Sequence, residues 1–107
     1  MRQQERIRVV VSGRVQGVFY RASTQEEATA IGVTGWVRNL DNGDVEFEAQ
    51  GTPDQLQQLL QWAQRGPARA LVTSLSQEAC PLQLHEHRFE VRLCKSRSRR
   101  PCATRPS

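Results

Sequence analysis

The first part of the chain joins an apolar strand to a helix through a short loop with a glycine near each end. Residues 7–11 read Ile-Arg-Val-Val-Val, the loop lies between Gly13 and Gly17, and Arg21 follows on the first helical turn. Glycine permits backbone turns that direct successive N–H groups toward one point, and a helix N-terminus adds positive partial charge. The planar guanidinium of Arg21 offers a fork of donors that suits phosphate or carboxylate. This stretch predicts an oxyanion site, although on spacing alone a structural turn with Gly17 at positive φ explains it equally well.

Two common phosphate-binding motifs are excluded by the same residues. The loop contains no Gly-Lys-Ser/Thr run, so it is not a nucleotide-binding loop of the Walker type. The spacing of Gly13 and Gly17 does not match the Gly-x-Gly-x-x-Gly pattern of dinucleotide-binding folds. Any anion held here is therefore held in another way.

Strand and helix patterns alternate along the rest of the chain. Apolar residues recur at every second position in several segments, which predicts strands over 6–12, 33–40, 44–50, 69–76 and 87–93. A helix is expected over residues 20–31, and a second helix is expected to begin after Thr52 and to end at Gly66.

Turn and cap residues support these boundaries. Gly32 is suited to end the first helix, and Asn42 followed by Gly43 is typical of a tight hairpin turn. Thr52 and Gln55 have the spacing of a capping box around Pro53. The order βαββαβ predicts an α+β fold, a ferredoxin-like α/β sandwich in which two helices cover one face of an antiparallel sheet.

The charges are divided unevenly along the 107 residues. Residues 1–93 hold 10 Lys and Arg against 11 Asp and Glu, whereas residues 94–107 hold 5 Lys and Arg and no acidic residue. The net charge is therefore −1 for the first part and +5 for the second. This composition predicts one folded domain over residues 1–93 and a basic, disordered tail over residues 94–107. Nucleic-acid binding by the folded part is not expected, and the basic tail leaves a weak contact with anionic partners open.

Neither a metal site nor a membrane segment is expected. Cys80, Cys94 and Cys102 are widely spaced, and His85 and His87 have no evident third ligand nearby. No apolar run approaches the ~20 residues that span a bilayer, and residues 1–11 lack the apolar core of a signal peptide. A cytoplasmic protein with reduced thiols and without a metal site is therefore expected. It is expected to be a monomer, because it is a small domain with no evident exposed apolar stripe.

Two motifs together closely resemble the acylphosphatase family. The first is Ser12-Gly13-Arg14-Val15-Gln16-Gly17-Val18-Phe19-Tyr20-Arg21. The second is Gly35-Trp36-Val37-Arg38-Asn39-Leu40, with Asp41-Asn42-Gly43, Val45-Glu46 and Gly66-Pro67 following in order. The resemblance extends over residues 5–93. It implies the same ferredoxin-like sandwich.

The resemblance also implies an activity and its residues. Acylphosphatases hydrolyse the carboxyl-phosphate anhydride of a small acyl phosphate to a carboxylate and inorganic phosphate, without metal or cofactor. The family's catalytic arginine and asparagine fall on Arg21 and Asn39. The backbone N–H groups expected to hold the substrate phosphate belong to Arg14, Val15, Gln16, Gly17, Val18, Phe19 and Tyr20.

Other interpretations of the same residues stay open. The loop could belong to a non-catalytic phosphate-binding module, and Asn39 could be a turn residue ahead of the hairpin. RNA-binding domains share the βαββαβ order but use exposed aromatic residues on their central strands, where this chain offers only Phe47. Acylphosphatase-like domains that handle carbamoyl phosphate in hydrogenase maturation head longer chains with cysteine-rich zinc segments, which are absent here.

Overall fold

The computed structural model describes residues 3–92. Its elements, in chain order, are β1 (Glu5–Arg14), α1 (Tyr20–Ile31), β2 (Thr34–Asn39), β3 (Val45–Gly51), α2 (Pro53–Arg65), β4 (Leu71–Ala79) and β5 (Phe89–Val91). The predicted domain boundary at residue 93, the tail 94–107, Cys94 and Cys102 lie outside the described residues.

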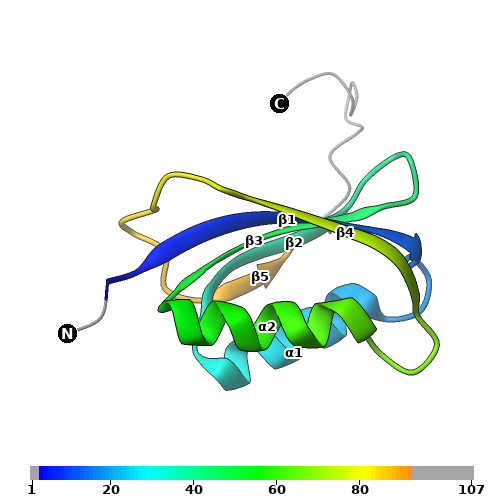
Figure 1. Cartoon of the computed structure of the whole chain (residues 1–107), viewed down its shortest axis with the longest axis horizontal. Helices are drawn as coiled ribbons and strands as arrows, with labels where there is room; N and C mark the ends of the chain where they lie inside the picture. Colours follow the sequence, from blue (N-terminus) through cyan, green and yellow to red (C-terminus); the bar gives the residue numbers. More distant parts are fainter. Residues whose placement is uncertain (1–2, 93–107) are drawn as a thin grey trace.

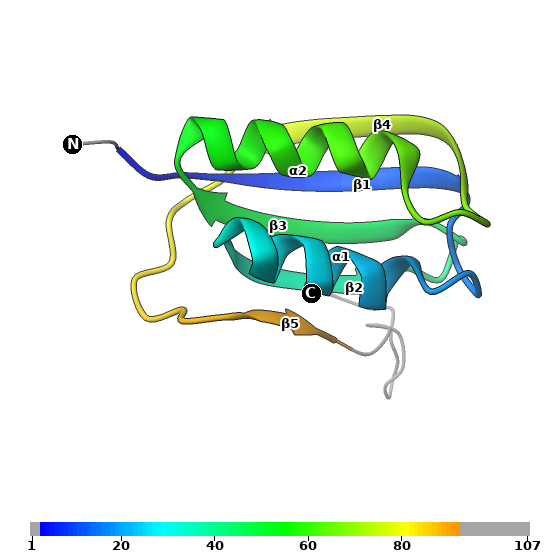
Figure 2. The same ribbon diagram turned by 90° about the horizontal axis from the view of Figure 1, so that it is seen from below.

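The strands form one sheet, and both helices lie on the same face of it (Figure 1). The strand order is β4-β1-β3-β2-β5, which Figure 2 shows from the helix side. Helix α2 packs over β4, β1 and β3, and α1 packs over β2 and β5. The predicted ferredoxin-like α+β sandwich is confirmed.

The prediction of a purely antiparallel sheet is wrong at one edge. Strands β1 and β3, β1 and β4, and β2 and β3 pair antiparallel, but β5 pairs parallel to β2. The reason is the path of the chain, because β4 lies at the opposite edge and runs antiparallel to β1. The connection from β4 crosses to the far edge without changing ends of the sheet, so β5 must run in the direction of β1 and β2. As a result β1, β2 and β5 all end at the same end of the sheet.

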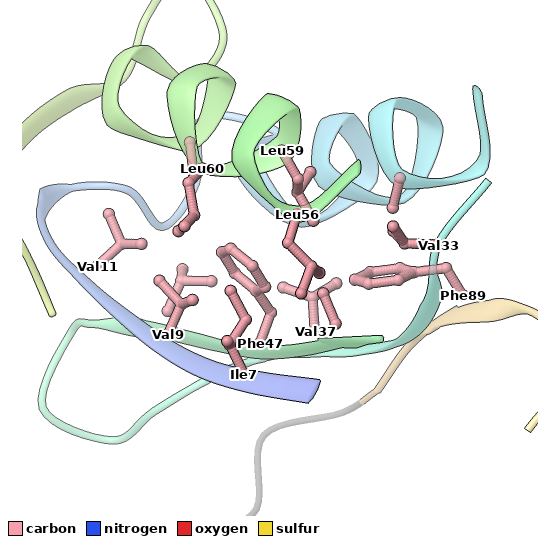
Figure 3. Close-up of a cluster of buried hydrophobic side chains, with 14 of the residues drawn as sticks. Ile7, Val9, Val11, Val33, Val37, Phe47, Leu56, Leu59, Leu60 and Phe89 are labelled. Atoms are coloured by element: carbon pink, nitrogen blue, oxygen red, sulfur yellow. The ribbon is translucent and has the colours of Figure 1, made fainter. Parts of the chain in front are cut away.

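The core lies between the sheet and the helices (Figure 3). Alternate residues of β1 and β3 point into it, which is the period-two burial that the sequence predicts for a half-covered strand. Helix α2 contributes the apolar stripe expected from its sequence. The main buried side chains are Ile7, Val9, Val11, Val37, Val45, Phe47, Leu56, Leu59, Leu60 and Phe89.

Helix boundaries agree with the sequence better than those of the outer strands. Thr52 and Gln55 form the predicted capping box, and Gly32 ends α1 with φ 101° while its N–H bonds to the Ala28 carbonyl. Strand β4 begins two residues later than expected, after a turn in which the Ala70 N–H donates to the Pro67 carbonyl. None of the helices in residues 3–92 is long and apolar enough to cross a membrane.

The sheet face opposite the helices carries a buried arginine. Arg6 is only 2% exposed, and its guanidinium donates to Glu48 at 2.6 Å and to Glu86 at 2.7 Å. Burial by itself lowers the pKa of Arg6, but the bonds and charges of Glu86 and Glu48 outweigh this effect and raise it. Further along the same face, Arg8 pairs with Glu46. Arginine side chains of β1 are thus paired with glutamate side chains of β3 across this face.

Candidate active site

The loop after β1 begins with an irregularity in the sheet. The pairing of β1 with β4 shifts by one residue between Ser12 and Gly13, and Gly13 has φ 122°. A Cβ atom at Gly13 would lie 2.1 Å from the Leu71 carbonyl oxygen, so only glycine fits here. Arg14 still belongs to β1 and is exposed, whereas the sequence placed it in the loop. The extra residue at this shift is Thr73 of β4, which lies opposite the junction of Ser12 and Gly13.

Helix α1 starts without a side-chain cap. Gly17 has φ 75°, as expected from the sequence, and Phe19 occupies the N-cap position with φ 65°. The Phe19 side chain has no oxygen to accept a hydrogen bond, and the first helical turn holds no acidic residue. The first N–H groups of a helix have no acceptor within the helix. An anion at this helix N-terminus therefore meets donors and no competing carboxylate of the first turn.

Gln16 fastens the loop to the hairpin between β2 and β3. Its Nε2 donates to the Leu40 carbonyl and to the Asp44 carbonyl, both at 2.8 Å. Val15, one residue earlier, is buried in the core. The loop is thus held by the buried side chain of Val15 and by the bonds of Gln16 to the hairpin that follows β2. The sequence assigned Gln16 only a backbone role, and nothing in its immediate neighbourhood revealed the partners, which lie 24 and 28 residues away.

One cavity of about 310 Å³ brings most of the predicted site residues together. It is lined by Val15, Gly17, Phe19, Tyr20, Arg21, Ala22, Asn39 and Val91. Arg14, Gln16 and Val18 do not line it. Ala22 and Val91 are new, and Val91 comes from a strand whose place beside β2 the sequence did not predict. A larger hollow of about 590 Å³ lies along residues 83–92 and contains none of the predicted residues.

Asn39 is the last residue of β2, and its backbone is held in register with Val45 of β3. Among residues 3–92, its side-chain Oδ1 is the buried polar side-chain atom that has no hydrogen-bond partner. Leaving a buried acceptor unpaired is unfavourable by about 1–3 kcal/mol. Such an atom beside a cavity is typical of a functional group that a ligand or water satisfies.

Arg21 lies on the first turn of α1 and is half-buried. Its Nη1 donates to the Arg92 carbonyl at 3.1 Å, immediately after β5. A guanidinium has five N–H donors, so this single bond orients the group and leaves other donors for an anion. The orientation of the Arg21 side chain thus depends on a carbonyl group 71 residues further along the chain.

The side chain of Tyr20 anchors the start of α1 and does not form part of the loop. Tyr20 is the first residue of α1, is fully buried, and donates its hydroxyl to the Ala63 carbonyl at 2.7 Å. Its ring packs against Trp62 at a centroid distance of 5.5 Å. Burial raises the pKa of Tyr20 above its ordinary value of 10.0, so the hydroxyl stays a donor at neutral pH. Tyr20 fixes the start of α1 to the core and to α2.

The described residues contain no cluster of three or more His, Cys, Asp or Glu side chains suited to a metal ion. His85 and His87 are both exposed. Burial and the nearby Glu48 raise the pKa of the Cys80 thiol. Among the residues that line the cavity, Arg21 is the one with a charged side chain, and its positive charge suits an anion.

Comparison with known proteins places this arrangement in a family. The acylphosphatase family model matches residues 7–91. An acylphosphatase of Rubrobacter xylanophilus is 47% identical over 91 residues, which cover 85% of this chain and 83% of that protein. One from Marinobacter nauticus is 51% identical over 73 residues, which cover 68% of this chain and 79% of that protein. The structure of an acylphosphatase from Coxiella burnetii superposes with a TM-score of 0.79 at 40% identity, covering 83% of this chain and 93% of that chain.

These matches define the class as a small hydrolase with a ferredoxin-like sandwich fold. The chain belongs to the acylphosphatase family. The predicted family and enzyme class are thereby confirmed.

Proposed function

We propose that the cavity between the glycine loop and the end of β2 is the active site, and that it hydrolyses acyl phosphates to a carboxylate and inorganic phosphate. One observation carries this proposal. Arg21, the loop at the N-terminus of α1, and the unpaired Oδ1 of Asn39 meet around one cavity. Each of the three groups has a separate part in phosphoryl transfer.

The phosphate is bound by the loop and by Arg21. Backbone N–H groups from Val15 to Tyr20 and the positive end of α1 surround the phosphoryl oxygens. Arg21 adds a charge-assisted bond and stabilises the negative charge that spreads over these oxygens in the transition state. Because these donors are held in place before the substrate arrives, no reorganisation is needed during the reaction.

Asn39 orients the attacking water. Its Oδ1 accepts a hydrogen bond from the water, which is then directed at phosphorus in line with the leaving group. The leaving group is a carboxylate, which departs without protonation by a strong acid. Neither a protein nucleophile nor a general base is required, and the reaction needs no metal or cofactor, because Arg21 and the N–H groups supply the positive charge.

The experiment that tests this function is hydrolysis of acetyl phosphate and benzoyl phosphate in the presence of EDTA. The wild-type protein is expected to hydrolyse both. Arg21→Ala and Asn39→Ala are each expected to lose at least about 10²–10³-fold in kcat, the loss typical of one preorganised donor. Arg69→Ala and Gln64→Ala are controls, because both positions are exposed and outside the cavity.

The alternative, a non-catalytic phosphate-binding module, makes the opposite prediction. In that case the folded wild-type protein binds inorganic phosphate through Arg21 but does not release carboxylate from either substrate. Turnover that persists in Asn39→Ala would instead contradict the water-orienting role alone.

We also propose that the protein is a cytoplasmic monomer, that its folded part does not bind nucleic acid, and that residues 94–107 take no part in the reaction. The face of the sheet opposite the helices supports the proposal that the folded part does not bind nucleic acid. Trp36 is only 8% exposed and lies between the guanidinium groups of Arg38 at 4.8 Å and Arg92 at 5.1 Å, so it offers no free ring for base stacking. Sedimentation of the pure protein tests the monomer, and sedimentation of a chain that ends at Leu93 with single-stranded RNA tests the folded part without the basic tail. A stable dimer or a co-sedimenting RNA would contradict them.

A further inference from the structure

Phe19 is exposed in a position where an aromatic side chain is unexpected. Its side chain is 77% exposed, the largest aromatic exposure in the described residues, although it lies at the mouth of the cavity. It is also the only residue other than glycine with positive φ in residues 3–92. This left-handed conformation is unfavourable for a bulky residue. Two unfavourable features at one residue beside the active site call for a functional explanation.

The cavity has a polar end and an apolar rim. Arg21 and Asn39 form the polar end, together with the N–H groups of the loop. The rim is formed by Phe19, by Ala22 on the first turn of α1, and by Val91 at the end of β5. Val91 is 40% exposed and lies opposite the core residue Val37, so its side chain is on the helix side of the sheet.

The rim is held in place relative to the polar end. The bond from Arg21 to the Arg92 carbonyl fixes the end of β5 beside α1, and Val91 is the preceding residue. Phe19 in turn directly precedes α1, whose first backbone bond joins the Ser23 N–H to the Phe19 carbonyl. The backbone of Phe19 and the end of β5 that carries Val91 are thus both connected to the first turn of α1, which carries Arg21.

We infer that this rim binds the acyl group of the substrate and makes the enzyme selective for acyl phosphates with an aromatic or large apolar acyl group. The inference rests on the proposed function. In an acyl phosphate, the acyl carbon is separated from phosphorus by a single bridging oxygen. A phosphate held by Arg21 and the loop thus places the acyl group at the mouth of the cavity. An aromatic acyl group there covers the exposed ring of Phe19 and the side chain of Val91, which removes apolar surface from water.

The test compares benzoyl phosphate with acetyl phosphate, which share the reacting atoms and differ in the acyl group. The measured quantity is the ratio of kcat/KM for benzoyl phosphate to kcat/KM for acetyl phosphate. Phe19→Asn is expected to lower this ratio about tenfold, the effect of losing one apolar contact in a binding site. Asparagine tolerates positive φ, so the loop conformation is kept. Phe19→Tyr retains the ring and is expected to retain the ratio.

Two further variants separate contact from loop geometry. Val91→Thr keeps the branched shape of the side chain but makes it polar, and it is expected to lower the ratio in the same direction. Leu84→Asn is the control, because Leu84 is also an exposed apolar residue but lies outside this cavity. It is expected to leave both substrates unaffected.

A ratio that is unchanged in Phe19→Asn overturns the inference. An equal loss of kcat/KM for both substrates also leaves the ratio unchanged, and it would mean that Phe19 affects only the loop.

Turnover of acetyl phosphate by the wild type tests the proposed function separately. Should the wild type hydrolyse neither substrate, calorimetric binding of benzoylphosphonate and acetylphosphonate still decides the matter. Tighter binding of the benzoyl compound that depends on Phe19 supports the apolar rim, and equal binding overturns it.

Discussion

At the scale of single residues, the site combines groups that are favourable for stability with groups that are not. Tyr20 is buried, hydrogen-bonded and packed on Trp62, and it anchors α1. Two other residues are unfavourable for stability. Asn39 buries an unpaired side-chain oxygen, and Phe19 exposes its ring and has a left-handed backbone conformation. Unfavourable positions of this kind are retained where function requires them.

The first prediction concerns the stability of Asn39→Ala. Alanine removes the buried, unpaired Oδ1, so the free energy of unfolding is expected to stay within about 1 kcal/mol of the wild-type value or to rise. Turnover is nevertheless lost. The measurement is urea unfolding followed by circular dichroism, carried out on the same preparation as the kinetic assay. A decrease in stability well beyond that range would show that the side chain has a structural partner.

At the scale of elements, the site depends on contacts between segments that are distant in the sequence. The glycine loop was evident from Gly13 and Gly17, and the end of β2 from the hairpin turn at Asn42 and Gly43. That the loop lies against this hairpin is due to the two bonds of Gln16. A side-chain amide that meets two main-chain carbonyls can be found only once the strands are paired.

The second prediction concerns this connection. Gln16→Ala removes both hydrogen bonds and is expected to lower the free energy of unfolding by about 1–2 kcal/mol. Because the loop then moves relative to Asn39, kcat is expected to fall about tenfold or more, since small misplacements have large kinetic effects. Gln16→Glu is expected to be worse, because a carboxylate would face two carbonyl oxygens.

The control for Gln16 is Gln64→Ala, which removes an exposed glutamine from α2. For the three variants, the free energy of unfolding, kcat and the inhibition constant of inorganic phosphate are measured and compared with the wild-type values. If Gln16→Ala changed stability but left kcat and phosphate inhibition at the wild-type values, the connection would have no part in positioning the loop.

At the scale of the whole molecule, the common direction of β1, β2 and β5 brings the functional groups to one end of the sheet. The glycine loop follows β1, Asn39 is the last residue of β2, and Val91 is the last residue of β5. Figure 2 shows the order of these strands in the sheet. The opposite end is held by another network, in which Arg6 contacts Glu86 in the connection between β4 and β5. Breaking a buried ion pair by removing one partner typically lowers stability by about 3–5 kcal/mol. The far end of the sheet thus has a structural role, and the near end holds the proposed active site.

The third prediction concerns residues 94–107. The folded part spans both motifs and the matched region 7–91, so a chain that ends at Leu93 is expected to keep kcat/KM and to unfold within about 0.5 kcal/mol of the full chain. Thermal unfolding and hydrolysis of acetyl phosphate are the measurements. A truncated chain that did not fold, or that folded without turnover, would place part of the functional unit beyond residue 93.

The roles proposed for Arg21 and Asn39 come from the resemblance to the acylphosphatase family. The sequence by itself determined the order of elements, both helices, the C-cap of α1, the capping box of α2 and the glycine loop. These features depend on local physics, namely apolar periodicity, cap chemistry and glycine conformation, which neighbouring residues already specify. Only the tertiary structure decided that β5 pairs parallel to β2, that Arg6 is buried, that Gln16 joins the loop to the hairpin, and that Val91 completes the cavity. Each of these depends on which strands become neighbours, and a contact between residues up to 80 positions apart leaves no signal in the sequence around either partner.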